Sequence, residues 1–290
     1  KKQTEINSKV GDRLNLFELF VKIGVDDQAS GKLKDLGGKL GNGLKTAAKI
    51  GTAAVGAAAA GITALTTAAV NNYAEYEQLV GGVETLFGKS ADTVMKYAEN
   101  AYKTAGLSAN EYMATVTSFS ASLISGLGGD TEAAAKIADK AIKDMSDNAN
   151  TFGTNIQDIQ NAYQGFAKGN FTMLDNLKLG YGGTKEEMQR LLKDAEKFSG
   201  VKYDINNLND VYSAIHVIQT ELGITGTTAK EAASTISGST NMMKSAWTNL
   251  VTGIADDNAN FEELIDNFIE SVMAVADNLL PRIQTTIQGM

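Results

Sequence analysis

The sequence contains no cysteine, one proline, one histidine and one tryptophan among 290 residues. Without cysteine, the chain has no disulfide, no thiolate metal ligand and no thiol nucleophile. The near absence of proline, together with abundant glycine and alanine, disfavours an all-β fold and is typical of helices joined by short turns. Hydrophobic residues make up 43% and charged residues 21%, a balance that indicates a globular chain rather than a disordered one.

The only histidine, His216, lies in the segment VYSAIHVIQTEL, whose apolar periodicity predicts a helix. The sequence contains neither the G-x-S-x-G motif of a serine nucleophile nor the H-E-x-x-H motif of a zinc site. We therefore expect His216 to be packed or half-exposed on a helix, without a catalytic role.

The segment LGYGGTKEE, residues 179–187, resembles a phosphate-binding loop only superficially. Such a loop needs lysine followed by serine or threonine, and here Thr184 precedes Lys185. A glycine joint followed by a helix N-cap at Thr184 explains the segment better.

Two acidic pairs and the only tryptophan also have structural explanations. Asp256–Asp257 and Glu262–Glu263 could in principle supply the two carboxylates of a glycosidase, but each pair precedes or opens a predicted helix, where it favours the helix dipole. Trp247 fits a core anchor better than a ligand-stacking residue.

We expect no catalytic residue, no cofactor-binding residue, no metal ligand, no cofactor and no enzymatic activity.

The net charge of −8 is unevenly distributed, because residues 1–49 hold ten basic and six acidic residues, about +4, and the remainder carries −12. The basic segment is diluted by glycine and has no interleaved aromatic residues, so we expect no sequence-specific nucleic-acid binding. A basic flank beside an uncharged helix suits an anionic lipid surface, and an ordinary solvated face is the alternative.

Residues 50–70, IGTAAVGAAAAGITALTTAAV, form an uncharged stretch long enough to cross a bilayer as a helix. Its five Ile, Leu and Val residues contribute only about −1.5 to −3 kcal/mol towards insertion, and glycine and threonine oppose it. Three interpretations remain open: a closely packed helix, a helix that inserts conditionally, and a permanent span. The residues that would pack closely or face lipid are Ile50, Gly51, Val55, Gly56, Gly61, Ile62, Leu65 and Val70.

Helix start signals recur after residue 88 and indicate about nine to eleven helices. Capping boxes are predicted where Ser or Thr precedes Glu by three residues, at Ser108, Thr184 and Thr228, and Asn260 begins a close variant. Asp130 is predicted to cap an alanine-rich helix. The apolar run at 14–26 is the only strand candidate.

The C-terminal segment has the clearest helical periodicity in the chain. Apolar residues recur at steps of four and three, which predicts a face that packs on a partner helix of this chain or of another. Pro281 interrupts the pattern and should kink the helix. The residues of this face are Phe261, Ile265, Phe268, Val272, Val275 and Leu279.

These patterns predict an all-α protein with at most one short N-terminal strand. We expect a basic, glycine-spaced segment at 1–49, an uncharged helix at 50–75, a multi-helix module at 76–254, and a coiled-coil-like amphipathic helix at 255–290. Because the helical pattern is still running at residue 290, we expect the chain to be a section of a longer polypeptide.

Two stretches of the chain resemble the core region of tail tape measure proteins from long-tailed phages, especially phages of Gram-positive hosts. They are YEQLVGGVETLFGKSADTVMKYAENAYKTAGLSANEYM at 76–113 and FGTNIQDIQNAYQGFAKGNFTMLDNLKLGYGGTKEEMQRLLKDAEK at 152–197. The resemblance covers about residues 16–254, and the small-residue helix before residue 76 is in the family's usual order. It is a resemblance of extended pattern and involves no enzyme motif.

The resemblance implies a structural virion protein whose copies lie in the lumen of the tail tube and whose helical length sets tube length. It implies assembly in the host cytoplasm, release at infection ahead of the genome, and help for the genome across the host envelope. The implied partners are the tail tube protein, tail assembly chaperones, tail-tip proteins, other copies of the chain and the host membrane. The alternative from composition alone is a secreted helical pore-forming or effector-carrier protein.

Overall fold

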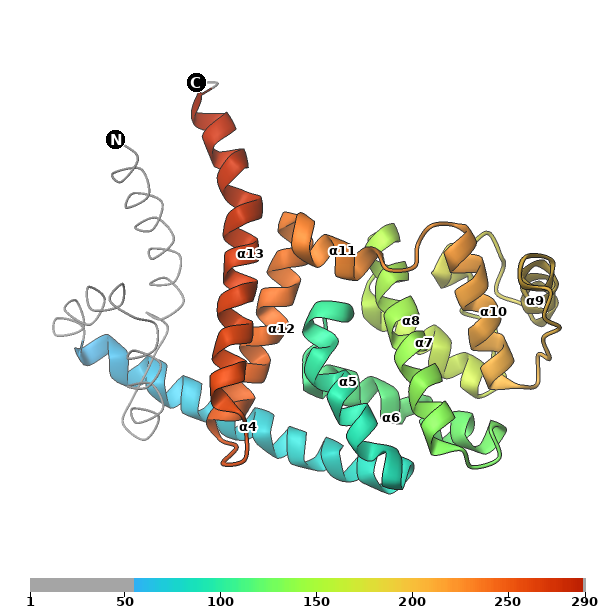
Figure 1. Ribbon diagram of the computed structural model, residues 1–290, viewed down its shortest axis with the longest axis horizontal. Helices are drawn as coiled ribbons and strands as arrows, with labels where there is room; N and C mark the ends of the chain where they lie inside the picture. Colours follow the sequence, from blue (N-terminus) through green and yellow to red (C-terminus); the bar gives the residue numbers. More distant parts are fainter. Residues whose placement is uncertain (1–54, 289–290) are drawn as a thin grey trace. The chain divides into compact units, whose positions relative to one another are not determined.

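The computed structural model describes residues 55–288, and its described part consists of helices and turns without a strand. This confirms the predicted all-α fold. The strand candidate at 14–26 and the segment 1–49 lie outside the described residues. In chain order (Figure 1) the elements are α4 (Val55–Phe87), η3 (Gly88–Ser90), α5 (Ala91–Thr104), α6 (Ala109–Gly126), α7 (Thr131–Phe152), α8 (Ile156–Ala167), η4 (Leu174–Leu177), α9 (Lys185–Ser199), α10 (Leu208–Glu221), α11 (Thr227–Ser234), α12 (Ile236–Ile254) and α13 (Phe261–Gln288).

The chain divides into two compact units. The described part of the first unit comprises residues 55–74 and 250–270, and that of the second comprises 75–249 and 271–288. The second unit holds the main hydrophobic core. The boundaries expected from the sequence at residues 76 and 254 stay predictions.

Helix α7 is the central element of the second unit and packs against α5, α6, α8, α10 and α11 (Figure 1). Its alanine-rich face lets these neighbours approach closely, because Ala134, Ala138 and Ala141 are almost fully buried and leave no long side chain between the helices. Ile142 and Met145 on the same helix are also buried and fill the remaining space.

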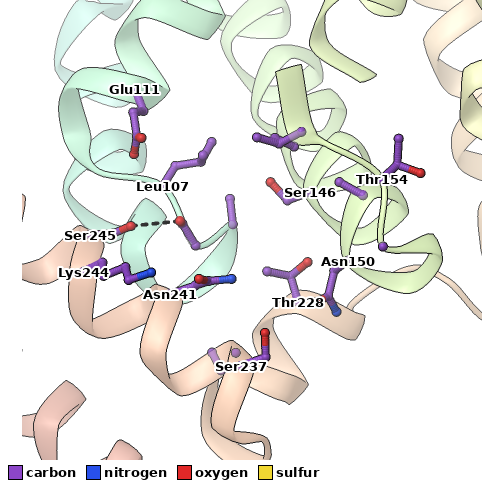
Figure 2. Close-up of a pocket in the computed structure, with 17 residues that line it drawn as sticks. Leu107, Glu111, Ser146, Asn150, Thr154, Thr228, Ser237, Asn241, Lys244 and Ser245 are labelled. Atoms are coloured by element: carbon purple, nitrogen blue, oxygen red, sulfur yellow. Dashed lines mark hydrogen bonds between the residues drawn. The ribbon is translucent and has the colours of Figure 1, made fainter. Parts of the chain in front are cut away.

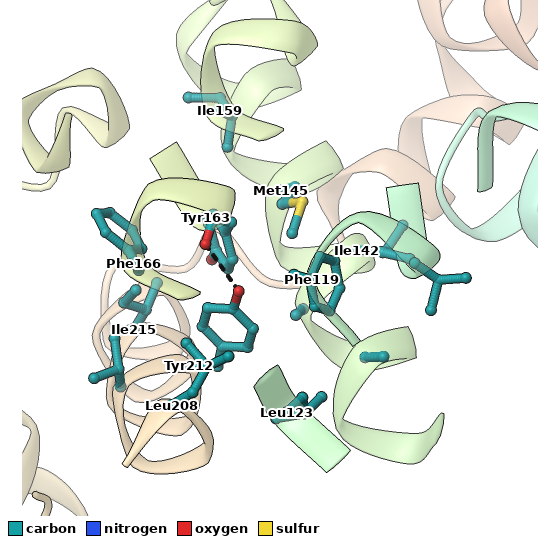
Figure 3. Close-up of a cluster of buried hydrophobic side chains, with 14 of the residues drawn as sticks. Phe119, Leu123, Ile142, Met145, Ile159, Tyr163, Phe166, Leu208, Tyr212 and Ile215 are labelled. Atoms are coloured by element: carbon teal, nitrogen blue, oxygen red, sulfur yellow. Dashed lines mark hydrogen bonds between the residues drawn. The ribbon is translucent and has the colours of Figure 1, made fainter. Parts of the chain in front are cut away.

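Aromatic residues from α6, α8 and α10 join this core, as Figure 3 shows. The rings of Phe119 and Tyr212 meet edge to face, with centroids 5.5 Å apart. The hydroxyl of Tyr212 donates a hydrogen bond of 2.9 Å to the backbone carbonyl of Tyr163, so this buried polar group is satisfied. Burial raises the pKa of the Tyr212 hydroxyl, and it remains protonated.

Two of the predicted helix starts are confirmed in full. Ser108 and Glu111 form a complete capping box at the start of α6, in which each side chain accepts a hydrogen bond from the other residue's backbone N–H. At the start of α7, the Asp130 carboxylate accepts hydrogen bonds from the backbone N–H groups of Glu132 and Ala133 at 3.1 and 3.0 Å.

The predicted start at Thr184 is half confirmed. Its hydroxyl caps α9 by accepting a hydrogen bond from the Glu187 N–H. The Glu187 carboxylate turns instead to Arg190 and to the Gly182 N–H, which together lower the pKa of Glu187 to about 2. Gly183 must be glycine here, because a Cβ would collide with the backbone carbonyl of Thr172.

The predicted capping box at Thr228 is wrong. Helix α11 begins at Thr227, and its N-cap position is Gly226, which has no side chain to cap the helix. The orphan N–H groups are satisfied from another helix, because the Asp147 carboxylate of α7 accepts hydrogen bonds from Gly226 and Thr228. The prediction failed because a tertiary contact replaces the local cap: the buried Asp147 carboxylate accepts the hydrogen bonds that a capping side chain would accept.

Candidate functional site

The C-terminal half of α7 carries an unusual density of buried polar side chains. Asp144, Ser146, Asp147 and Asn148 are each at most 4% exposed, within a helix that otherwise buries alanine, isoleucine and methionine. Buried polar groups cost stability unless they are hydrogen-bonded, so each requires a partner or another explanation. This run provides the candidate functional residues.

Asp144 pairs with the only histidine of the chain. The Nδ1 atom of His216, on α10, lies 2.8 and 3.0 Å from the two carboxylate oxygens of Asp144. The imidazole is 25% exposed, whereas the carboxylate is 2% exposed. Burial raises the pKa of Asp144, and its hydrogen bond with His216 opposes that shift. The sequence predicted a packed or half-exposed histidine, and the structure adds a buried carboxylate partner 72 residues away along the chain.

A cavity of about 500 Å³ lies beside the end of α7, as Figure 2 shows. Its walls come from the α5–α6 joint, the end of α7 with the following turn, helix α11 and the first half of α12. The α11 and α12 walls approach closely because position 238 is glycine, where a Cβ would collide with the backbone of Glu231. All the lining residues belong to the second unit.

Unsatisfied polar atoms concentrate in this cavity. Among the described residues, six buried side-chain nitrogen and oxygen atoms have no hydrogen-bond partner within the protein, and four of them belong to residues that line the cavity. Figure 2 shows Ser146, Asn150 and Thr228 around one space and Thr154 beside it, with the Thr154 hydroxyl pointing away from the other three residues. The four atoms are Ser146 Oγ, Asn150 Nδ2, Thr154 Oγ1 and Thr228 Oγ1.

The opposite wall carries the cavity's two charged residues. The Glu111 carboxylate is already engaged, because it accepts hydrogen bonds from the Ser108 N–H and hydroxyl at 2.8 and 2.9 Å. Lys244 is exposed and forms no ion pair with any residue that the structure describes. The hydroxyl of Ser245 is occupied by a 2.8 Å hydrogen bond to the Gly106 carbonyl, drawn in Figure 2.

Chemically, the cavity offers hydroxyl and amide groups that donate and accept hydrogen bonds, with an ammonium group at its edge. Within the described part of the chain, His, Asp and Glu form no group of three or more that could hold a metal ion. Sequence reasoning missed this site. The available signal was the polar run from Asp144 to Asn150 inside an alanine-rich helix.

The residues predicted to face lipid or to pack closely lie around residue 55, where the described part of the chain begins. Ile50 and Gly51 lie outside the described residues. Val55, Gly56, Gly61, Ile62 and Leu65 lie in α4, and Val70 of the same helix is 55% exposed. None of the described helices combines the length and hydropathy that crossing a membrane requires. The role predicted for this stretch stays a prediction.

The predicted partner face lies on α13. Ile265, Phe268 and Val275 are buried, and Phe261, Val272 and Leu279 are half-buried. The helix is continuous from Phe261 to Gln288 and therefore passes through Pro281. Whether the face serves a partner helix of another chain stays a prediction.

Three comparisons with known proteins give no relative for this chain. No family model, no curated protein and no solved structure matches it.

Proposed function

We propose that this chain is a structural, non-enzymatic section of a phage tail tape measure protein. The observation that carries the proposal is the extended resemblance of residues 76–113 and 152–197 to the core region of that family. In this role the protein lies in the lumen of the tail tube, sets tube length during assembly in the host cytoplasm, and leaves the virion at infection.

The all-helical fold supports a role in which length is the functional quantity. A helix extends about 1.5 Å per residue, so the 33 residues of α4 span about 50 Å and the 28 residues of α13 span about 42 Å. Between these long helices, the module from α5 to α11 is compact and cannot act as a rod. In the proposed role, the long helices α4 and α13 therefore set the length of the tail tube. The compact module adds little to that length.

The proposed partners follow from this role. They are the tail tube protein along the lumen, tail assembly chaperones before the tube forms, tail-tip proteins at the start of assembly, and other copies of the chain. At infection, we propose that the uncharged segment 50–70 contacts the host membrane and helps the genome across the envelope.

The test is a change of helical length in the parent phage. An in-frame duplication of residues 261–288 adds about 42 Å of helix, and we expect tails lengthened by about that amount in electron micrographs. A same-length control, Val272→Ile, should leave tail length at its parental value. Normal assembly of tails of parental length by the duplication variant would contradict a ruler role for this segment.

A further inference from the structure

We propose that the cavity between the end of α7 and helices α11 and α12 binds a small polyhydroxylated molecule that carries a carboxylate. The inference does not rest on the proposed function, because it is drawn from the second unit's own side chains. Its starting point is that four of the six unpartnered buried polar atoms in the described chain belong to this one cavity.

Burying these groups without a hydrogen-bond partner lowers the stability of the free protein. Ser146 is 4% exposed, and its hydroxyl has no partner within the protein. Alanine would fill almost the same space without burying a polar atom, and the same helix uses alanine at Ala149 beside it. Unsatisfied buried polar groups gathered in one cavity are typical of a site whose hydrogen bonds are completed by a bound molecule.

The type of polar group indicates the chemistry of the ligand. Three of the four unpartnered groups are hydroxyls, on Ser146, Thr154 and Thr228, and a hydroxyl both donates and accepts hydrogen bonds. The matching ligand groups are themselves hydroxyls. The fourth group, the side-chain Nδ2 of Asn150, donates hydrogen bonds and matches an acceptor oxygen of the ligand.

The other residues that line the cavity further restrict the chemical class of the ligand. None of the lining residues is aromatic, so the cavity has no ring on which a nucleobase or another flat ligand would stack. Lys244 offers a positive charge at the edge and has no anionic partner among the described residues, which favours a carboxylate on the ligand. The volume of about 500 Å³ lies in the range of small-molecule sites.

The experiment titrates the intact chain with three probes and follows the backbone amide signals of the cavity residues by NMR. D-gluconate carries hydroxyls and a carboxylate, D-glucose carries hydroxyls only, and acetate carries a carboxylate only. We expect D-gluconate to shift the signals of Ser146, Asn150, Thr154 and Thr228 with a Kd of about 1 mM, D-glucose to bind more weakly, and acetate to have no effect.

Variants then assign the contacts. Ser146→Ala and Thr228→Val should each weaken D-gluconate binding about tenfold without lowering the melting temperature of the free protein, because each removes an unpartnered buried hydroxyl. Lys244→Gln should abolish the preference for D-gluconate over D-glucose. Ser237→Trp, at an exposed position of the lining, should block binding. Ser234→Ala removes a hydroxyl of α11 outside the cavity and should bind like the native chain.

Three results would overturn the proposal. The first is the absence of shifts at the cavity amides with every probe at about 50 mM. The second is acetate reproducing the effect of D-gluconate, since the hydroxyls would then be unused. The third is native affinity in both Ser146→Ala and Thr228→Val. Because tail length plays no part in this experiment, its failure leaves the proposed function untouched.

Discussion

At the scale of single residues, the carboxylates of α7 connect this helix to its neighbours. Asp139 accepts a hydrogen bond from the Tyr112 hydroxyl of α6, Asp144 pairs with His216 of α10, and Asp147 caps α11. Each carboxylate has a different partner element, and an unpaired buried charge is costly. Together the three contacts favour one relative arrangement of these helices over its alternatives.

The first prediction concerns Asp147. Asp147→Ala removes the acceptor for the N–H groups of Gly226 and Thr228 at the start of α11, at 2.6 and 2.8 Å, and should lower the free energy of unfolding by about 1–2 kcal/mol. Chemical denaturation measures this loss, and hydrogen exchange should accelerate first in α11. Asp158→Ala, an exposed change in the first turn of α8, should stay within about 0.5 kcal/mol of the native chain. Equal losses for the two variants would rule out the cross-helix cap.

The second prediction concerns the buried pair of Asp144 and His216. His216→Ala leaves the 2%-exposed carboxylate without its partner and should cost about 3 kcal/mol near neutral pH. It also removes the hydrogen bond that lowers the pKa of Asp144, so burial raises that pKa further above the ordinary value of an aspartate. A carboxyl whose folded pKa lies above its unfolded value takes up a proton on folding, so stability increases as pH falls through the raised pKa towards the unfolded value.

A matched pair of variants isolates this effect. Near pH 7, His216→Ala should be less stable than the double variant His216→Ala with Asp144→Asn, which carries no buried charge at that position. The gap between their urea midpoints should close as the pH falls to about 4. A gap that is constant with pH would show that burial does not raise the pKa of Asp144 in the folded single variant.

At the scale of elements, α4 combines two kinds of sequence in one continuous helix. Residues 55–74 carry no charge, whereas the continuation to Phe87 carries three glutamates, Glu75, Glu77 and Glu84. Small residues permit close helix packing in water or in lipid, and too few large apolar residues are present for a strong preference for lipid. The helix is therefore suited to a change of environment between assembly and ejection, as the proposed function requires.

The third prediction tests this helix by liposome flotation. The purified chain should float with anionic liposomes, and a variant carrying Ala57→Asp and Leu65→Lys should not, because charges oppose insertion by about 2.5–3.5 kcal/mol each at a helix centre. Circular dichroism of both proteins controls for loss of helix. If neither protein floats and both are equally helical, the segment is a packing helix and the proposed membrane contact is wrong.

At the scale of the whole molecule, the main hydrophobic core of the described residues belongs to one continuous part of the chain. Its buried members run from Val83 to Ile224, and all of them lie within residues 75–249. A core of this extent, contributed by helices that follow one another closely in sequence, should be able to fold without the rest of the chain.

The fourth prediction follows from this placement of the core. A fragment comprising residues 75–249 should be monomeric, give dispersed NMR signals and unfold in a single cooperative transition. Phe119→Ala within the fragment should cost about 3–5 kcal/mol, because this ring is 2% exposed and packs against Tyr212. Molten behaviour of the native fragment, with bound hydrophobic dye and no near-ultraviolet dichroism, would show that the core needs the other segments.

The sequence by itself determined the helical class and those helix starts whose capping groups lie within three residues of each other. Ser108 with Glu111 is such a case, and so is Asp130 with the backbone that follows it. Local hydrogen bonds of this kind depend only on spacing along the chain, so a pattern is sufficient to find them. The apolar periodicity of the last helix was visible for the same reason.

Tertiary structure alone decided where the buried polar groups find their partners. Asp147 caps α11 across 79 residues, and Asp144 meets His216 across 72, so no local pattern predicts either pair. The cavity was equally hidden, because its walls come from five helices separated in the sequence. Burial sets the energetic consequence of each polar group, and burial exists only once the helices have packed.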